Sequence, residues 1–280
     1  MIRLRLAALL SAVAILGACS GDKSGGSSKG PGDDAPWSPA KLTSVQGIPS
    51  AAIETALRSK LAGSAPAKID ADQWGHTRSL YKQYGNNPLW LAADGLHGDR
   101  AFALTNAVLQ AEQDGMRMDA YPVGALANAI TAIGEGKQPT ADQLADADII
   151  LTASFVALGE DYLTGQVDPR TVAQNWHIDP EDEKVDSALA RAIRITAIDR
   201  AIATMRPQDP DYTGLRKQLD RYQQIVVRGG WPAVPSGEAV KPGEKMSPAR
   251  VAALRQRLAA EGYAVPQAQN AQATQGTYDR

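Results

Sequence analysis

The chain has 280 residues, a formal net charge of −2 and a single cysteine. A mildly acidic chain without a basic tract argues against nucleic acid as a partner. Because one cysteine allows no intramolecular disulfide, the folded part has to be stabilised by a packed core. Beyond the N-terminus no apolar run approaches the length that crosses a bilayer.

The first 18 residues have the regions of a secretory signal peptide. Arg3 and Arg5 supply positive charge, and residues 6–16 form an apolar run broken only by Ser11. This run is long enough for a signal and too short to span a bilayer. Small residues then lead to Cys19. Cleavage before Cys19 would remove both arginines and lower the formal net charge from −2 to −4.

The string Leu16-Gly17-Ala18-Cys19 resembles the lipobox of bacterial lipoproteins. The resemblance implies that the Cys19 thiol is acylated and becomes the new N-terminus, with an ordinary secretory signal as the alternative. Two or three acyl chains together anchor a protein stably, whereas one does not. Ser20 in place of an aspartate is similar to the sorting pattern of outer-membrane lipoproteins. We therefore expect lipid attachment at Cys19, on the periplasmic face of the outer membrane.

Residues 19–48 are expected to form a disordered tether. The part from 20 to 34 is rich in glycine and serine and has no large apolar residue. Such a segment cannot bury enough surface to offset the entropy cost of ordering. Random-coil scaling gives it a span of roughly 25 Å. The tether would hold the folded part at a modest distance from the membrane.

From residue 49 to 230, apolar residues recur at helical spacing. Thr140-Ala141-Asp142-Gln143 has the spacing of a capping box and opens the longest predicted helix, which ends near Thr164. Its middle is apolar on most faces, which is typical of the central helix of a bundle. The other predicted helices cover 50–61, 72–84, 121–133, 186–204 and 211–227, and one more starts at Asp99. Ser50 and Asp99 are the predicted N-caps of their helices. The helix from Asp99 carries Phe102, Leu104, Val108 and Leu109, and the helix over 211–227 carries Leu215, Leu219, Tyr222 and Ile225.

After residue 230 the composition changes. Residues 231–246 are rich in proline and glycine and are expected to be a linker. Ser247-Pro248 is a cap and first-turn pair that opens a last helix within 247–263. Residues 264–280 are mostly polar and are expected to be a disordered tail. Since strand signals are scarce throughout, the sequence predicts an all-α protein.

The residues that could carry chemistry do not form a recognisable site. His76, His97 and His177 lie far apart, whereas zinc ligands cluster at short spacings. On a helix, the side chains of Glu160 and Asp161 diverge by about 100° and cannot share a site. The acids at 181–183 fit the first turn of a helix, where the macrodipole favours them. We therefore expect no catalytic residue, no metal and no cofactor.

Four aromatic residues lie close together along the chain: Trp74, Tyr81, Tyr84 and Trp90. Such a cluster could stack on the face of a sugar. Large aromatic side chains more often fill a core. The core interpretation is favoured, and contact with a sugar stays open.

Five strings between residues 72 and 263 carry a family resemblance. They are Leu80-Tyr81-x-x-x-Gly85-x-x-Pro88-Leu89-Trp90; Asp114-Gly115 with Asp119-Ala120-Tyr121; Ala147-Asp148 through Phe155 with Gly165-Gln166-Val167-Asp168-Pro169; Asn175-Trp176-His177; and Tyr212-x-x-Leu215-Arg216 through Gly229-Gly230-Trp231-Pro232 to Val251-x-x-Leu254-Arg255-x-Arg257-Leu258. In this order they resemble the helical scaffold domain of large bacterial L,D-transpeptidases, which form 3→3 crosslinks in peptidoglycan. Met116 and Arg117 depart from the corner motif of that domain.

The resemblance implies the non-catalytic half of such an enzyme. In the family, a downstream catalytic domain carries a histidine and a Ser-x-Gly-Cys-x-Arg motif, and no residue of this chain matches them. The resemblance also implies a scaffold domain at 49–230, peptidoglycan as a partner, and at 247–263 the start of an incomplete peptidoglycan-binding-like module. Two alternatives stay open. The chain could be a stand-alone peptidoglycan-binding or adaptor lipoprotein that docks a partner enzyme, or an inactive truncated product.

Overall fold

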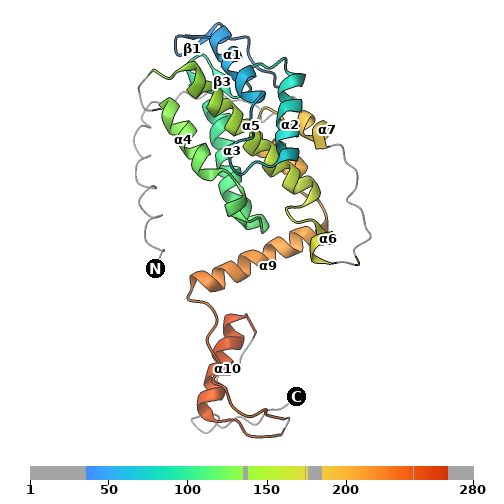
Figure 1. The fold of residues 1–280 in the computed structure, drawn as a ribbon. Helices are drawn as coiled ribbons and strands as arrows, with labels where there is room; N and C mark the ends of the chain where they lie inside the picture. Colours follow the sequence, from blue (N-terminus) through green and yellow to red (C-terminus); the bar gives the residue numbers. More distant parts are fainter. Residues whose placement is uncertain (1–35, 135–137, 174, 176–184, 242, 264–280) are drawn as a thin grey trace, which may run out of the picture. The chain divides into compact units, whose positions relative to one another are not determined.

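The computed structural model describes residues 36–134, 138–173, 175, 185–241 and 243–263. Within these ranges it contains ten α-helices, two short 3₁₀ helices and two hairpins of two-residue strands (Figure 1). In chain order they are β1 (Ser44–Val45), β2 (Ile48–Pro49), α1 (Ser50–Leu61), α2 (Ala71–Gln83), β3 (Leu91–Ala92), β4 (Gly95–Leu96), α3 (Gly98–Gln110), η1 (Ala111–Asp114), η2 (Met118–Ala120), α4 (Val123–Gly134), α5 (Ala141–Thr164), α6 (Pro169–Val172), α7 (Val185–Ala192), α8 (Ile198–Met205), α9 (Pro210–Val227) and α10 (Pro248–Ala260). The all-α prediction is confirmed.

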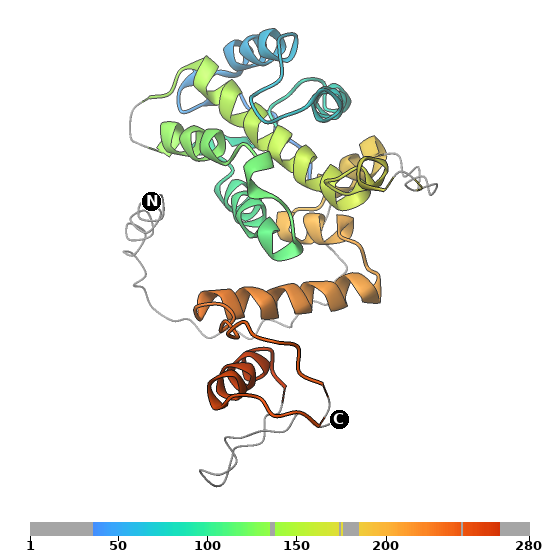
Figure 2. The same cartoon turned by 60° about the horizontal axis from the view of Figure 1, so that its bottom comes forward.

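Helix α5 is the centre of the core. It packs against α1, α2, α3, α4, α7 and α8, which surround it in Figures 1 and 2. Its middle, from Ala147 to Gly159, is buried on every face, as the sequence predicts. The predicted capping box is also present: Gln143 N–H donates to Thr140 Oγ1 over 3.2 Å, and Thr140 N–H donates to Gln143 Oε1 over 2.8 Å. Local polar groups therefore fix where the central helix begins.

A buried carboxylate on α5 holds α2 and the segment that enters β3. Asp148 accepts hydrogen bonds from the Tyr81 hydroxyl over 2.5 Å and from the backbone N–H groups of Leu89 and Trp90 over 2.9 and 2.7 Å. Burial raises the pKa of Asp148 to about 6, although these three donors favour its charged form. The Trp90 indole N–H donates to Thr152 Oγ1 over 3.0 Å. A polar cluster inside the core thus fixes the register of three segments.

The prediction of one helix over 186–204 is wrong, because the chain breaks between α7 and α8. The break coincides with the buried Arg100 of α3, which is only 2 % exposed. Its guanidinium donates to the carbonyl oxygens of Ile195 and Thr196, each over 2.9 Å, and of Ile193 over 3.0 Å. A cation that accepts no hydrogen bond needs such carbonyl partners when it is buried. Between α7 and α8 the backbone leaves the helical conformation, and its carbonyl oxygens accept the hydrogen bonds of Arg100.

Two predicted helix caps are also wrong. Pro49 is the N-cap of α1, and the Ser50 hydroxyl donates to the Leu42 carbonyl over 2.7 Å instead of capping the helix. His97 is the N-cap of α3, with Asp99 inside the first turn. On α3, moreover, only part of the predicted apolar face is buried: Leu104 and Val108 are buried, and Phe102 and Leu109 are exposed.

The folded part begins before residue 49. Residues 36–48, predicted as part of the tether, contain the strand β1, and Val45 is fully buried in the core. This hairpin could not be anticipated from composition, because its few apolar residues are separated by prolines and polar residues. The predicted signal at 1–18, Cys19, the tether up to residue 35 and the tail at 264–280 lie outside the described residues.

Helix α10 begins at the predicted Ser247-Pro248 pair, and α9 begins in the same way one residue before its predicted start. Asp209 caps α9 and Ser247 caps α10, each followed by a proline in the first turn. Ile225 is the one buried residue of α9, so the predicted apolar face of this helix is largely exposed. Beyond α9, Trp231 lies with its ring 5.6 Å from that of Tyr222. Of the helices that the structure describes, none combines the length and apolar character needed to cross a membrane.

Candidate functional site

The described histidines have separate surroundings. The Nδ1 atom of His76 lies 2.8 Å from Asp186 Oδ1, and the Ser79 hydroxyl donates to Asp186 Oδ2 over 2.9 Å. Because Ser79 donates to the carboxylate rather than to the imidazole, this trio lacks the serine–histidine contact of a catalytic triad. His97 stands before α3, and His177 lies outside the described residues. In the described part of the chain, no three His, Cys, Asp or Glu residues gather as metal ligands would.

The Glu160 and Asp161 side chains lie in different surroundings, as their helical spacing predicts. Asp161 accepts hydrogen bonds from the Tyr121 hydroxyl over 2.6 Å and from Gln166 Nε2 over 3.1 Å. Glu160 has a buried Oε2 atom without a hydrogen-bond partner. Burial raises the pKa of Glu160 to about 7, and the neighbouring His76 opposes this shift. The two carboxylates therefore do not face a common site, as the paired carboxylates of a glycoside hydrolase would.

Asp114 joins α9 to the core through a polar network. Its side chain is fully buried and accepts hydrogen bonds from the hydroxyls of Tyr162 on α5 and Tyr212 on α9, over 2.6 and 2.9 Å. Two cations accompany it: Arg206 Nη2 lies 3.1 Å from Oδ2, and Arg216 Nε lies 2.5 Å from Oδ1. Because these four partners occupy both carboxylate oxygens, the network is a structural junction rather than an open site.

The strings that carry the family resemblance are thus mainly structural. Tyr81, Leu89 and Trp90 from the first string meet Asp148 from the third. Asp114 from the second string meets Tyr212 from the last. These residues hold segments together that lie far apart along the chain. The recognisable pattern therefore marks the fold, and a binding site has to be sought elsewhere.

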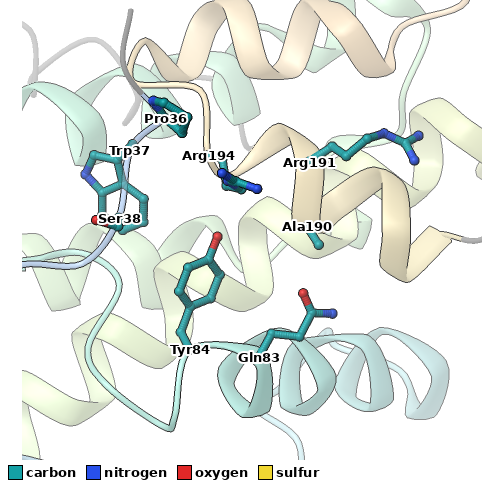
Figure 3. A pocket seen from close by; sticks show the side chains of 8 residues that line it. All are labelled: Pro36, Trp37, Ser38, Gln83, Tyr84, Ala190, Arg191 and Arg194. Atoms are coloured by element: carbon teal, nitrogen blue, oxygen red, sulfur yellow. The ribbon is translucent and has the colours of Figure 1, made fainter.

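A cavity of about 650 Å³ lies where the segment before β1 meets the end of α2 and α7 (Figure 3). It is lined by Pro36, Trp37, Ser38, Gln83, Tyr84, Ala190, Arg191 and Arg194. We call it the Trp37 cavity. In Figure 3 the Tyr84 hydroxyl points toward Arg194, and the Arg191 guanidinium extends away from Trp37. Three separate segments thus contribute to one recess.

Aromatic rings form one wall of the Trp37 cavity. The rings of Trp37 and Tyr84 lie 6.4 Å apart with a tilt of 58°. Behind them, the guanidinium carbon of the buried Arg100 lies 3.9 Å from the Trp37 ring centre and 5.5 Å from that of Trp90. The backbone N–H of Trp37 donates to the backbone carbonyl of Arg194 over 2.7 Å. The wall is therefore held in place by both a cation–π contact and a backbone hydrogen bond.

The Trp37 cavity is electropositive. Among the lining residues that the structure describes, two are arginines and none is an acid. Burial lowers the pKa of Arg100 to about 10, which leaves it charged at neutral pH. A recess with a flat apolar wall and cationic groups can hold an anion attached to a flat group. Of the four aromatic residues singled out in the sequence, Trp74, Tyr81 and Trp90 are core residues, and only Tyr84 lines this cavity.

The sequence did not predict this site. Trp37 fell within the predicted tether, and Arg191 and Arg194 fell within one predicted helix. Trp37-Ser38-Pro39, an aromatic residue among prolines just before the fold, was the one local signal that could have marked the cavity.

Comparison with known proteins gives one match. A family model described as Scaffold domain matches residues 75–219, from within α2 to within α9. No curated protein and no solved structure matches the chain. The matched range contains the central helix α5 and the buried carboxylates of Asp114, Asp148 and Asp161. Because this range is more than half of the chain, the protein belongs to the scaffold-domain family.

Proposed function

We propose that this chain is a lipid-anchored protein of the bacterial cell envelope that acts at peptidoglycan as a non-catalytic scaffold. The observation that carries the proposal is the scaffold-domain match over residues 75–219. The five ordered strings that resemble L,D-transpeptidases support a role in 3→3 crosslinking and wall remodelling. The lipobox-like string before Cys19 supports the lipid anchor, and the last helix supports the start of a wall-binding module.

Sedimentation with purified cell walls tests this function. The full chain, extracted in detergent, is mixed with sacculi freed of lipid and protein and is then centrifuged. We expect the chain in the pellet, in an amount that saturates as sacculi are added and falls when soluble wall fragments compete. A chain that stays wholly in the supernatant would contradict wall binding.

The non-catalytic part of the proposal has its own assay. The purified chain is incubated with tetrapeptide-rich sacculi, and the digested products are analysed by mass spectrometry. We expect no new 3→3 crosslinks from the chain alone, because no residue matches the catalytic histidine, cysteine or arginine of the enzymes that it resembles. Crosslinks formed without any added enzyme would refute this part of the proposal.

A second candidate function is an adaptor that docks a partner enzyme. The exposed apolar residues of α9 favour it, since Leu215 is 71 % and Val227 is 81 % exposed. Replacing both by serine should leave sacculus binding unchanged and weaken capture of a purified L,D-transpeptidase catalytic domain. Equal capture by the wild-type and the variant chain would remove the reason for this candidate.

A further inference from the structure

We propose that the Trp37 cavity binds a carboxylate that is attached beside a flat, weakly polar group. A sugar acid and the C-terminal end of a short peptide both have this chemistry. The inference goes beyond the proposed function, because it concerns the chemical class of ligand and stands on the cavity itself. If the ligand is a wall fragment, the cavity also supplies the contact that the proposed function requires.

Charge is the first argument. Arg194 lines the cavity, the described lining residues include no acid, and Arg100 lies buried behind Trp37. Within the described part of the chain, the Arg194 side chain makes no hydrogen bond or ion pair. Elsewhere in the core, Asp114 compensates Arg206 and Arg216. An anionic ligand would give Arg194 the carboxylate partner that the protein supplies to those two arginines.

The shape of the charged group is the second argument. A guanidinium presents a planar fork of donors that matches the two oxygens of a carboxylate. In Figure 3 the Tyr84 hydroxyl points toward Arg194, so a second donor faces the same space. Tyr84 and Arg194 together can therefore hold one carboxylate group in the cavity.

The aromatic wall is the third argument. Trp37 is only half-buried, and its ring has Arg100 3.9 Å away on the core side. Indole rings with an exposed apolar surface are common contacts for the flat face of a sugar or for a small apolar side chain. A ligand that carries its carboxylate close to such a face would contact Trp37 and Arg194 at the same time.

Another cavity in the described part of the chain has different chemistry. It has a volume of about 630 Å³, lies at the end of α5 and is lined in part by Asp161 and Gln166. Asp161 brings an acid into that recess, and its oxygen already accepts hydrogen bonds from Tyr121 and Gln166. That cavity is therefore less suited to an anion. The combination of flat wall and uncompensated cation is a property of the Trp37 cavity.

Two matched pairs of small probes test the inference on the full chain. N-acetylmuramic acid is compared with N-acetylglucosamine, which has the same sugar ring and no carboxylate. N-acetyl-Lys-D-Ala-D-Ala is compared with its C-terminal amide. Binding is followed by the indole N–H signals in nuclear magnetic resonance spectra, and Trp37→Phe identifies the Trp37 signal. We expect at least one of the two acids to shift that signal saturably. Its neutral counterpart should bind at least about tenfold more weakly.

Arg194→Gln is the decisive variant. It should weaken binding of the acid about tenfold and leave the neutral probe unaffected. Arg58→Gln is the matched control, because Arg58 is also exposed, makes no described ion pair and lies on α1, outside the cavity. Circular dichroism shows whether both variants keep their helices. Since both side chains are exposed, neither substitution disturbs the core.

The possible outcomes are distinct. Preference for N-acetylmuramic acid or for the peptide acid identifies the source of the carboxylate and supports the inference. Equal affinity for acid and neutral probes, no saturable shift of the Trp37 signal, or equal losses in Arg194→Gln and Arg58→Gln would each overturn it. The proposed function is judged separately: sacculus binding that survives Arg194→Gln would keep that function and place the wall contact elsewhere.

Discussion

Replacement of Asp148 by alanine tests the role of the polar cluster inside the core. The substitution leaves three buried donors without an acceptor, namely the Tyr81 hydroxyl and the N–H groups of Leu89 and Trp90. Each unsatisfied buried donor costs about 1–3 kcal/mol, so the three together cost about 6 kcal/mol. Removal of the buried charge offsets part of this loss. A pKa of about 6 instead of 3.8 corresponds to about 3 kcal/mol at neutral pH.

The net expectation for Asp148→Ala is therefore a loss of about 3 kcal/mol in the free energy of unfolding. Urea denaturation of the full chain at neutral pH, followed by circular dichroism and tryptophan fluorescence, measures it. Asp146→Ala is the matched control on the same helix, because Asp146 is 63 % exposed and pairs with Lys60 at the surface. That variant should lose less than about 1 kcal/mol. Equal losses in the two variants would refute the assignment of Asp148 as a structural anchor.

The pH dependence of the same variant gives a second readout. Because folding raises the pKa of Asp148, the folded state binds the proton more tightly than the unfolded state does. The cost of burying the charge is absent below about pH 4 and complete above about pH 6. The difference in stability between wild type and Asp148→Ala should thus shrink as the pH rises through this window. A difference that grows with pH would contradict the sign.

Three further predictions concern other parts of the fold. Asp114→Asn removes the charged partner of two arginines, so backbone amide hydrogen exchange along α9 should accelerate while that of α5 stays slow; unchanged exchange in α9 would contradict the junction. Gly159→Ala would place a Cβ 2.6 Å from Leu189 Cδ2 and should cost about 1–3 kcal/mol in thermal or urea unfolding. The matched Gly214→Ala meets nothing within 4 Å and should stabilise by about 0.5–1 kcal/mol; the same sign for both would contradict this packing. Because burial raises the pKa of Glu160 to about 7, the melting temperature of the wild type should fall as the pH rises from about 4.5 to 7. Glu160→Gln should abolish this fall; identical pH profiles of the two proteins would show that the Glu160 carboxyl is solvated.

Features of the fold that depend on neighbouring residues were predictable from the sequence. Thr140 and Gln143 form the expected capping box, and Ser247 with Pro248 starts the last helix. The middle of α5, which is apolar on most faces, correctly predicted a buried central helix. In each case the side chains that decide the structure lie within a few residues of one another, so the local pattern is sufficient.

Features that depend on distant contacts were not predictable. The break between α7 and α8 is stabilised by Arg100, which reaches carbonyl groups more than 90 positions along the chain. Leu215 has helical spacing with the other apolar residues of α9 but remains exposed, whereas Ile225 of the same helix is buried. Periodicity shows which side chains share a face and does not show whether anything covers that face.

The candidate site belongs to the second group. The Trp37 cavity needs a segment before β1, the end of α2 and the α7–α8 region to meet, and each was assigned to a different role in the sequence. The strings that carry the family resemblance were informative about the fold, since their carboxylates and hydroxyls meet in the core. They pointed to the family and not to the cavity.

The most direct test of the account is the intact mass of the protein extracted from bacterial envelopes, because every part of the proposed function requires export and anchoring. We expect a membrane-associated species that has lost the 18 residues before Cys19 and gained the mass of its acyl chains. Alanine at position 19 should abolish both changes. An unprocessed or unacylated chain recovered from the soluble fraction would contradict the proposed lipid anchor.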